Sequence, residues 1–134
     1  MLYQDLTDKI IQAFYTVYNT LGYGFLERVY ENAMIFELQA SGFEIAKQHK
    51  IKVFYKNLVV GEYYADLIVN DTVIIELKAT ELICKEHEIQ LINYLKSTNI
   101  ELGLLLNFGK KPEFRRIIFS NHRKTRNESI HQQS

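Results

Sequence analysis

Three charged residues stand in apolar surroundings near the middle of the chain and could act together in catalysis. Glu76 and Lys78 lie two residues apart in the run VIIELKAT, residues 73–80, and Asp66 lies in the preceding run GEYYADLIV. Side chains alternate along a strand, so Glu76 and Lys78 point to the same face. Because charged groups are costly to bury unless something offsets the cost, these three residues are candidates for a functional site.

Whether Asp66 meets Glu76 depends on the turn between the two runs. A two-residue turn after Val69 would place Asp66 opposite Ile75 and leave Glu76 opposite Ala65. A three-residue loop over residues 70–72, or an equivalent bulge, would place Asp66 opposite Glu76 on one face. The sequence leaves both registers open, and only the second brings the two carboxylates together.

The charged residues have a structural interpretation and a chemical one. In the first, Lys78 neutralises Glu76 in an ion pair, although buried ion pairs are inefficient stabilisers. In the second, the carboxylates of Asp66 and Glu76 and the backbone carbonyl of Leu77 offer hard oxygen ligands to Mg²⁺, or to Mn²⁺ in its place. Such a metal activates a water and polarises a phosphoryl oxygen, and Lys78 would orient the water or stabilise the developing charge. The chemistry predicted is hydrolysis of a phosphate ester.

The elements that must position these residues follow from the spacing of apolar residues. Two amphipathic helices are expected first, then a third at about residues 85–97. Strands are expected at about 44–55, 58–69 and 73–79, and in LGLLLNF and RRIIF. This order predicts an α/β fold, with a central mixed β-sheet of about five strands flanked by helices and with VIIELKA as a central strand. The residues expected to face the core are Leu6, Ile10, Phe14, Val17 and Leu21 in the first helix, Leu26, Val29, Ala33, Phe36 and Ala40 in the second, and Ile89, Ile92 and Leu95 in the third.

Composition limits the classes of protein that the chain can be. Its 134 residues fit one domain, predicted at residues 1–119, followed by a polar, basic C-terminal tail at 120–134. The single cysteine, Cys84, excludes an internal disulfide and a four-cysteine metal site. The sequence has no apolar run long enough for a membrane span and no secretory signal, so a cytoplasmic protein is expected. The net charge is zero, yet lysines and arginines gather at residues 47–56 and from residue 110 onward, a distribution that permits a side facing nucleic acid.

Three motifs of the chain resemble those of one enzyme superfamily. The spacing Asp66-x9-Glu76-x-Lys78 resembles the signature of the PD-(D/E)XK nucleases, although Ala65 stands at the variable position of the proline. GFLERVY, residues 24–30, matches the G-x-x-E-x-x-Y motif of a small bacterial and archaeal family within that superfamily. QLINY, residues 90–94, matches the Q-x-x-x-Y motif of its recombination-exonuclease branch. The resemblance runs from the first helix to about Phe119.

This resemblance implies a restriction-endonuclease-like core and Mg²⁺-dependent hydrolysis of DNA, with Asp66, Glu76 and Lys78 as catalytic residues. It adds Glu27 as a further acid on the metal side, presented by the second helix. Gln90 and Tyr94 lie on one helix face, where they would contact the substrate or steady Lys78. Glu27 shares a helix stripe with Tyr30, Glu31 and Met34, which lies off the core-facing stripe and could face the site. Tyr30, from the same motif as Glu27, would be a supporting residue there. The resemblance also suggests a homodimer.

A second function remains open on the sequence alone. A nuclease-fold module that binds nucleic acid or a protein partner without cutting is favoured by the zero net charge, because nonspecific affinity for DNA comes mainly from neutralising phosphates. The complete set of two acids and a lysine favours the enzyme.

Overall fold

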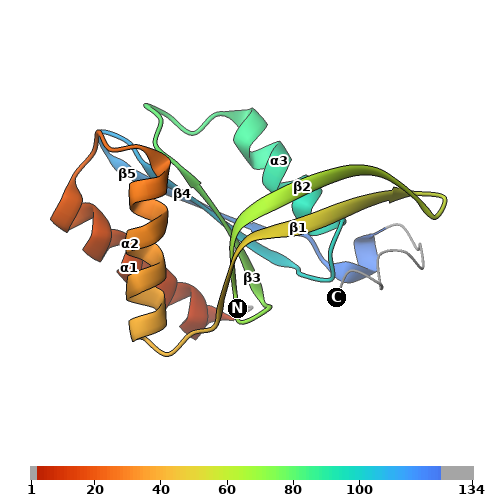
Figure 1. The fold of residues 1–134 in the computed structure, drawn as a ribbon, viewed down its shortest axis with the longest axis horizontal. Coiled ribbons are helices and arrows are strands. Elements are labelled where there is room, and N and C mark those ends of the chain that lie inside the picture. The colour runs from red at the N-terminus through yellow and green to blue at the C-terminus, as the bar shows by residue number, and fades with distance from the viewer. Residues whose placement is uncertain (1–2, 125–134) are drawn as a thin grey trace.

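The structure, a computed structural model, describes residues 3–124 and has a mixed α/β architecture (Figure 1). Its α-helices are α1 (Gln4–Leu21), α2 (Glu27–Ala40) and α3 (Lys85–Lys96). Its strands are β1 (Ile45–Tyr55), β2 (Leu58–Val69), β3 (Val73–Lys78), β4 (Leu102–Phe108) and β5 (Pro112–Ile118), and a short 3-10 helix, η1 (Asn121–Arg123), follows them. The predicted fold class is therefore confirmed, and the predicted elements lie within a few residues of the observed ones.

The five strands form one sheet in the order β1-β2-β3-β4-β5. Only β3 and β4 are parallel, because α3 lies between them in the chain and returns it to the same edge of the sheet. The other neighbours are antiparallel and are joined by short connections. β3 is the central strand and its first five residues are buried, as the apolar run predicts.

Apolar side chains pack on both faces of this sheet. α1 and α2 cover one face, where Phe14, Tyr30 and Phe108 belong to the larger core cluster. α3 covers the other face, where Leu91 and Leu95 pack with Ile74 and Leu105 of β3 and β4. The sheet is therefore the middle layer of three, and Figure 1 shows α1 and α2 well separated from α3.

The face that α2 turns to the core differs from the predicted one. Tyr30, Met34 and Leu38 are fully buried, whereas Leu26 and Phe36 are 81% and 69% exposed. The helix carries apolar residues on two faces, so periodicity alone does not choose between them. The ring of Tyr30 stacks on Phe108 at 4.2 Å between centroids, a contact between distant parts of the chain that decides the choice. In α3, likewise, Leu91 and Tyr94 are buried while Ile89 is 47% exposed.

The β1–β2 hairpin extends well beyond the rest of the sheet. β3 pairs with β2 only from Leu67 to Val69, so residues 58–65 of β2 pair with β1 alone. Figure 1 shows the outer half of the hairpin projecting past α3. This projection separates a compact body, which contains the acidic residues, from an arm with two largely exposed faces.

The first residues of the predicted tail pack on this body. The Asn121 backbone N–H donates to Glu101 Oε2 at 2.7 Å, and Lys124 is 9% exposed. Residues 120–124 of the predicted polar tail are therefore part of the folded body. The rest of the tail, 125–134, lies outside the described residues. In the part of the chain that is described, no helix is long and apolar enough to cross a membrane.

Candidate functional site

The loop between β2 and β3 has the length that brings the two acids together. Val69 pairs with Val73, so the connection is the three-residue loop 70–72. Asn70 and Asp71 both adopt left-handed backbone conformations, at φ 52°, which asparagine and aspartate tolerate better than most residues. Continuing this register places Asp66 opposite Glu76, which is the second of the two registers that the sequence left open.

At Asp66 and Glu76, hydrogen bonds between backbone and side chain replace the backbone-to-backbone hydrogen bonds that join β2 and β3. The regular ladder ends at Leu67 and Ile75. Beyond it, the Asp66 backbone N–H donates to Glu76 Oε1 at 3.2 Å, and the Leu77 backbone N–H donates to Asp66 Oδ2 at 2.8 Å. Each carboxyl group is thus held by the backbone of the opposite strand, and the two lie side by side.

This proximity changes the protonation of Glu76, which is only 4% exposed. Burial raises the pKa of Glu76 from 4.5 to about 9, and the charge of Asp66 and a hydrogen bond between the two carboxyl groups act in the same direction. A backbone hydrogen bond from Asp66 and the positive charge of Lys78 lower the pKa of Glu76, with smaller effect. At neutral pH, in the absence of a cation, Glu76 is therefore protonated.

Gln48 of β1 holds Asp66 from the other side. Its Nε2 donates to Asp66 Oδ1 at 3.4 Å and to Glu31 Oε1 of α2 at 2.9 Å.

The backbone of β1 and β2 is irregular beside the acidic pair. Gln48 has φ 48° within a strand, a conformation rare for a residue with a side chain. Ala65 and Ile68, three residues apart, pack in the same cluster, so the alternation of side chains in β2 shifts by one residue beside Asp66. The strands are therefore irregular at the acidic pair, a feature that clusters at functional sites.

Lys78, at the end of β3, does not form the ion pair of the structural interpretation. It is half-buried, and no ion pair with Glu76 occurs in the described part of the chain. The segment after it is fixed by Asn107 of β4, the residue that pairs with Lys78. Asn107 is fully buried, accepts from the Thr80 backbone N–H and donates to the Thr80 carbonyl, both at 3.0 Å. The strand that carries Lys78 is thus anchored immediately beyond it.

Gln90 and Tyr94 of α3 come together beside the acids. Gln90 Nε2 donates to the Tyr94 hydroxyl oxygen at 2.8 Å. Burial, followed by the charges of Glu76 and Asp66, raises the pKa of Tyr94 to about 12, although the bond from Gln90 lowers it. Tyr94 therefore remains a phenol at neutral pH, and it lies within electrostatic reach of both acids. A pocket on this side is lined by Tyr63, Glu86, Ile89, Gln90, Asn93 and Tyr94.

The acidic pair has the donors that a hard divalent cation requires. Carboxylate oxygens suit Mg²⁺, and the raised pKa of Glu76 shows that the site needs positive charge before it can ionise fully. A third ligand of this kind is not assembled: within residues 3–124 no three His, Cys, Asp or Glu side chains come close enough to hold a metal ion. The two acids fit Mg²⁺ as part of a ligand set, with water and substrate oxygens as the remaining ligands.

Sequence comparison identifies the family. A sequence model of the PD-(D/E)XK nuclease superfamily matches residues 4–117, which include every element from α1 to β5 almost in full. The chain belongs to the PD-(D/E)XK nuclease superfamily. No curated protein and no solved structure matches it. Members of the superfamily typically use a divalent metal ion and act on nucleic acid, which agrees with the acidic donors of the site.

The two motif residues of α2 lie in different surroundings. Tyr30, expected to face the site of this PD-(D/E)XK protein, is instead buried against Phe108. Its hydroxyl donates to the Gly22 carbonyl at 2.7 Å and accepts from the Phe25 backbone N–H at 3.2 Å, so it fixes the loop before α2. Glu27 begins α2 and is exposed, and no hydrogen bond joins it to the acidic pair in the described residues. Its role as a metal ligand stays a prediction.

Two supporting residues of the site, Gln48 and Asn107, were not predicted from the sequence, whereas Glu31 lies on the helix stripe that was expected to face the site. Gln48 is an ordinary polar residue in the sequence, and its connection to Asp66 depends on how α2 and β1 meet. Asn107 did carry a signal, because it is the one polar side chain in the apolar strand LGLLLNF. A buried amide in such a strand must find partners, and here its partner is the backbone that follows Lys78.

Proposed function

We propose that this protein is a Mg²⁺-dependent phosphodiesterase that hydrolyses DNA. The observation that carries the proposal is the pair of carboxyl groups, Asp66 and Glu76, held side by side by the opposite backbones, with Lys78 two residues further along β3. An apolar pair of the same volume would stabilise a sheet as well or better, so the pair is better explained by a reaction than by stability.

The chain's own residues supply most of what hydrolysis of a phosphodiester needs. Asp66 and Glu76 would hold Mg²⁺, which when bound acidifies a water and neutralises charge on the phosphate. Lys78 would place its ammonium group against the negative charge that grows on the phosphate oxygens as the water attacks. Gln90 already occupies an acceptor position of the Tyr94 hydroxyl, so Tyr94 would donate its proton to a substrate oxygen.

We further propose membership of the G-x-x-E-x-x-Y family, in which Glu27 is an acid of the active site. The motif residues form one local unit, because Gly24 has φ 111°, favoured by glycine, and Tyr30 holds the same loop. Glu27 follows directly on that loop. Glu31, one turn later, is the competing acid, since Gln48 connects it to Asp66.

The activity is tested on single-stranded, duplex, nicked and branched DNA, and on RNA, with Mg²⁺ or Mn²⁺ and with chelator. Lys78→Ala and Asp66→Asn should each lower the rate by about 100-fold or more while leaving the circular dichroism spectrum unchanged. Lys9→Ala, which removes an exposed lysine of α1, is the matched control and should be neutral. Failure of the unaltered protein to degrade any of these substrates would contradict the proposal.

The same assay separates the two acids of α2. Glu27→Gln should lower the rate strongly and Glu31→Gln only moderately, because Glu31 would act through Gln48 on the position of Asp66. The reverse order would contradict the G-x-x-E-x-x-Y assignment and make Glu31 the third acid of the site.

A nuclease-fold module that binds without cutting is the second candidate. It is favoured by the absence of a third metal-binding side chain within residues 3–124 and by the raised pKa of Glu76. Calorimetric titration with Mg²⁺ distinguishes the two candidates. Binding that Asp66→Asn abolishes supports the enzyme, and no detectable binding supports the module.

A further inference from the structure

A second concave site lies at the far side of α3, away from the acidic pair. It is a groove of about 540 Å³ between the outer half of the β1–β2 hairpin, the C-terminal end of α3 and η1. That volume lies within the range of sites for small organic ligands and is small for a folded partner. Its lining residues are Lys52, Val53, Phe54, Tyr55, Lys56, Lys96, Ser97, Phe119, Arg123 and Lys124.

The charged side chains that line this groove are all positive. Two come from β1 and its turn (Lys52 and Lys56), one from the end of α3 (Lys96), and two from the segment at η1 (Arg123 and Lys124). The whole chain has no net charge, so this arrangement concentrates positive charge in one hollow. An anionic ligand is therefore expected, and the repeated phosphates of a nucleic acid match several cations spread over separate elements.

Aromatic rings are interleaved with these cations. Arg123 and Lys96 both lie over the ring of Phe119, at 4.6 and 5.6 Å from its centroid. At the hairpin end, Tyr55 is 59% exposed and Lys56 lies 5.4 Å from its ring centroid. Phe119 is half-buried and positions its two cations, whereas the exposed ring of Tyr55 is the one on which an unpaired base could stack while the cations contact the phosphates.

The wall formed by η1 is fixed before any ligand arrives. Lys124 Nζ donates to the carbonyls of Thr98 and Ile100, at 2.7 and 2.9 Å, and to Asn121 Oδ1. The Asn121 side-chain amide also donates to the Asn99 carbonyl at 3.0 Å. Because the Lys124 ammonium is occupied in holding the wall, Lys96, Arg123 and Lys56 are the exposed cations on which the argument depends.

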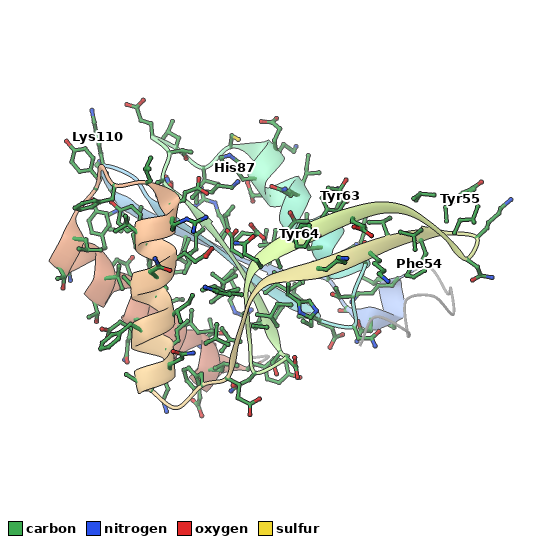
Figure 2. The ribbon with its side chains drawn as sticks, viewed as in Figure 1. Phe54, Tyr55, Tyr63, Tyr64, His87 and Lys110 are labelled. Atoms are coloured by element: carbon green, nitrogen blue, oxygen red, sulfur yellow. The ribbon has the colours of Figure 1, made fainter. Side chains whose placement is uncertain are left out.

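The groove and the acidic pair lie along the same hairpin. Gly61, the partner of Val53 in the groove, is five residues from Asp66, which corresponds to roughly 17 Å along β2. Between them, the ring of Tyr63 lies 5.6 Å from that of Tyr94. Figure 2 shows Phe54 and Tyr55 toward the outer part of the hairpin and Tyr63 closer to the body. One strand of a nucleic acid could thus contact both the groove and the acidic pair.

We propose that this groove binds a single-stranded stretch of the DNA substrate on one side of the scissile bond. The assignment to DNA rests on the proposed function, whereas the assignment to a single strand rests on the groove itself. Unpaired bases can enter a narrow groove and stack on Tyr55, and a duplex presents only its backbone there.

The test measures binding of a fluorescent oligothymidylate of about 15 nucleotides by anisotropy, in chelator, over a range of salt concentrations. Two variants alter the groove. Lys96→Ala/Arg123→Ala should weaken binding about tenfold or more and reduce the slope of log K against log salt by about 1.4, as expected for two lost phosphate contacts on a single strand. Tyr55→Leu should weaken binding about five- to 100-fold without changing that slope, because stacking releases no counterions.

Lys9→Ala/Arg115→Ala is the matched control, because it removes one exposed lysine and one exposed arginine outside the groove. The proposal is overturned if the groove variants bind like this control. It is also overturned if a duplex of equal length, or an RNA of the same sequence, binds the unaltered protein more tightly. Equal binding of a polyglutamate peptide, unaffected by Tyr55→Leu, would show a general polyanion site and would equally overturn it.

These outcomes are independent of cleavage, because no metal ion is present. Groove-dependent binding by a protein that never cleaves would refute the proposed function, and with it the placement beside a scissile bond, but would leave the assignment of a single strand to the groove standing. Cleavage by a protein in which the groove variants leave DNA binding unchanged would support the proposed function and overturn this inference. With both properties present, the groove variants should leave hydrolysis of a small phosphodiester, bis(p-nitrophenyl) phosphate, unchanged.

Discussion

Glu76 is the residue of the site whose protonation its surroundings change most. It lies in the central strand, where an apolar side chain would be expected, and its carboxyl group faces that of Asp66. With pKa raised to about 9, it holds a proton at neutral pH unless a cation takes its place. Binding of Mg²⁺ at the proposed site would therefore release a proton, so affinity for Mg²⁺ should rise with pH.

The first prediction concerns the stability of the metal-free protein. The folded-state pKa of Glu76, about 9, exceeds its ordinary value of 4.5, so the folded state binds more protons between these values. Stability should therefore fall as pH rises through this window, by at most about 1.4 kcal/mol per pH unit. Glu76→Gln cannot ionise, so it should flatten this dependence and be more stable than the unaltered protein at about pH 8.

Urea denaturation in chelator at several pH values measures this effect. Glu37→Gln, at the far end of α2, is the control for the loss of one carboxyl group and should keep the slope of the unaltered protein. A Glu76→Gln variant whose stability still falls steeply with pH would show that the proton lies elsewhere.

At the scale of elements, the loop before α2 depends on one hydroxyl group. Tyr30→Phe keeps the ring stacked on Phe108 but removes the bonds to Gly22 and Phe25. Two part-buried backbone groups lose their partner, so we expect a loss of about 0.5–1.5 kcal/mol in the free energy of unfolding. Tyr15→Phe, at a more exposed position of α1, is the control and should change stability little. If the two variants unfold alike, the hydroxyl of Tyr30 does not hold the loop.

A glycine in the β4–β5 turn controls the segment after Lys78. A Cβ atom at Gly109 would lie 2.4 Å from the Thr80 carbonyl oxygen, whereas one at Gly61 would make only ordinary contacts, the nearest at 3.7 Å. Gly109→Ala should therefore displace residues 79–81 and lower both stability, by about 1–3 kcal/mol, and nuclease activity. Gly61→Ala is the matched control, expected to change stability by less than about 1 kcal/mol. Equal effects in thermal unfolding and cleavage assays would contradict this account.

Some features of the helices and strands could be predicted from the sequence, and others could not. The order of the elements along the chain and the central position of β3 were predicted, because alternation of side chains is a local property. The pairing of Asp66 with Glu76 was one of two registers left open, and the three-residue loop 70–72 decides between them. The buried face of α2 was not, because Leu26 and Phe36 are as apolar as Met34 and only the contact of Tyr30 with Phe108 decides between the faces. Gln48 was missed for the same reason, since its left-handed conformation arises where β1 and β2 leave the sheet.

At the scale of the whole molecule, the two proposed sites would perform different tasks of a nuclease. Glu76 of the acidic pair stays protonated at neutral pH unless a cation binds, whereas the groove beyond α3 is lined by positive side chains that suit an anion. Both lie along the β1–β2 hairpin, so a strand bound in the groove would lead its phosphates toward a metal ion at the pair. The zero net charge of the chain conceals this separation.

The last prediction is that Mg²⁺ stabilises the whole fold, because the site joins β2, β3 and, through Gln48, α2. A ligand that binds only the folded state at about 100 times its Kd adds about 2.7 kcal/mol. For a chain of this size that corresponds to a rise in Tm of roughly 5–10 °C. The rise should be larger at about pH 8 than at about pH 6, since Glu76 must release its proton.

Asp66→Asn should abolish this rise in Tm, and Lys9→Ala should preserve it. An unchanged Tm in both buffers would contradict a metal site at this pair, because an ion that binds only the folded state must raise its stability.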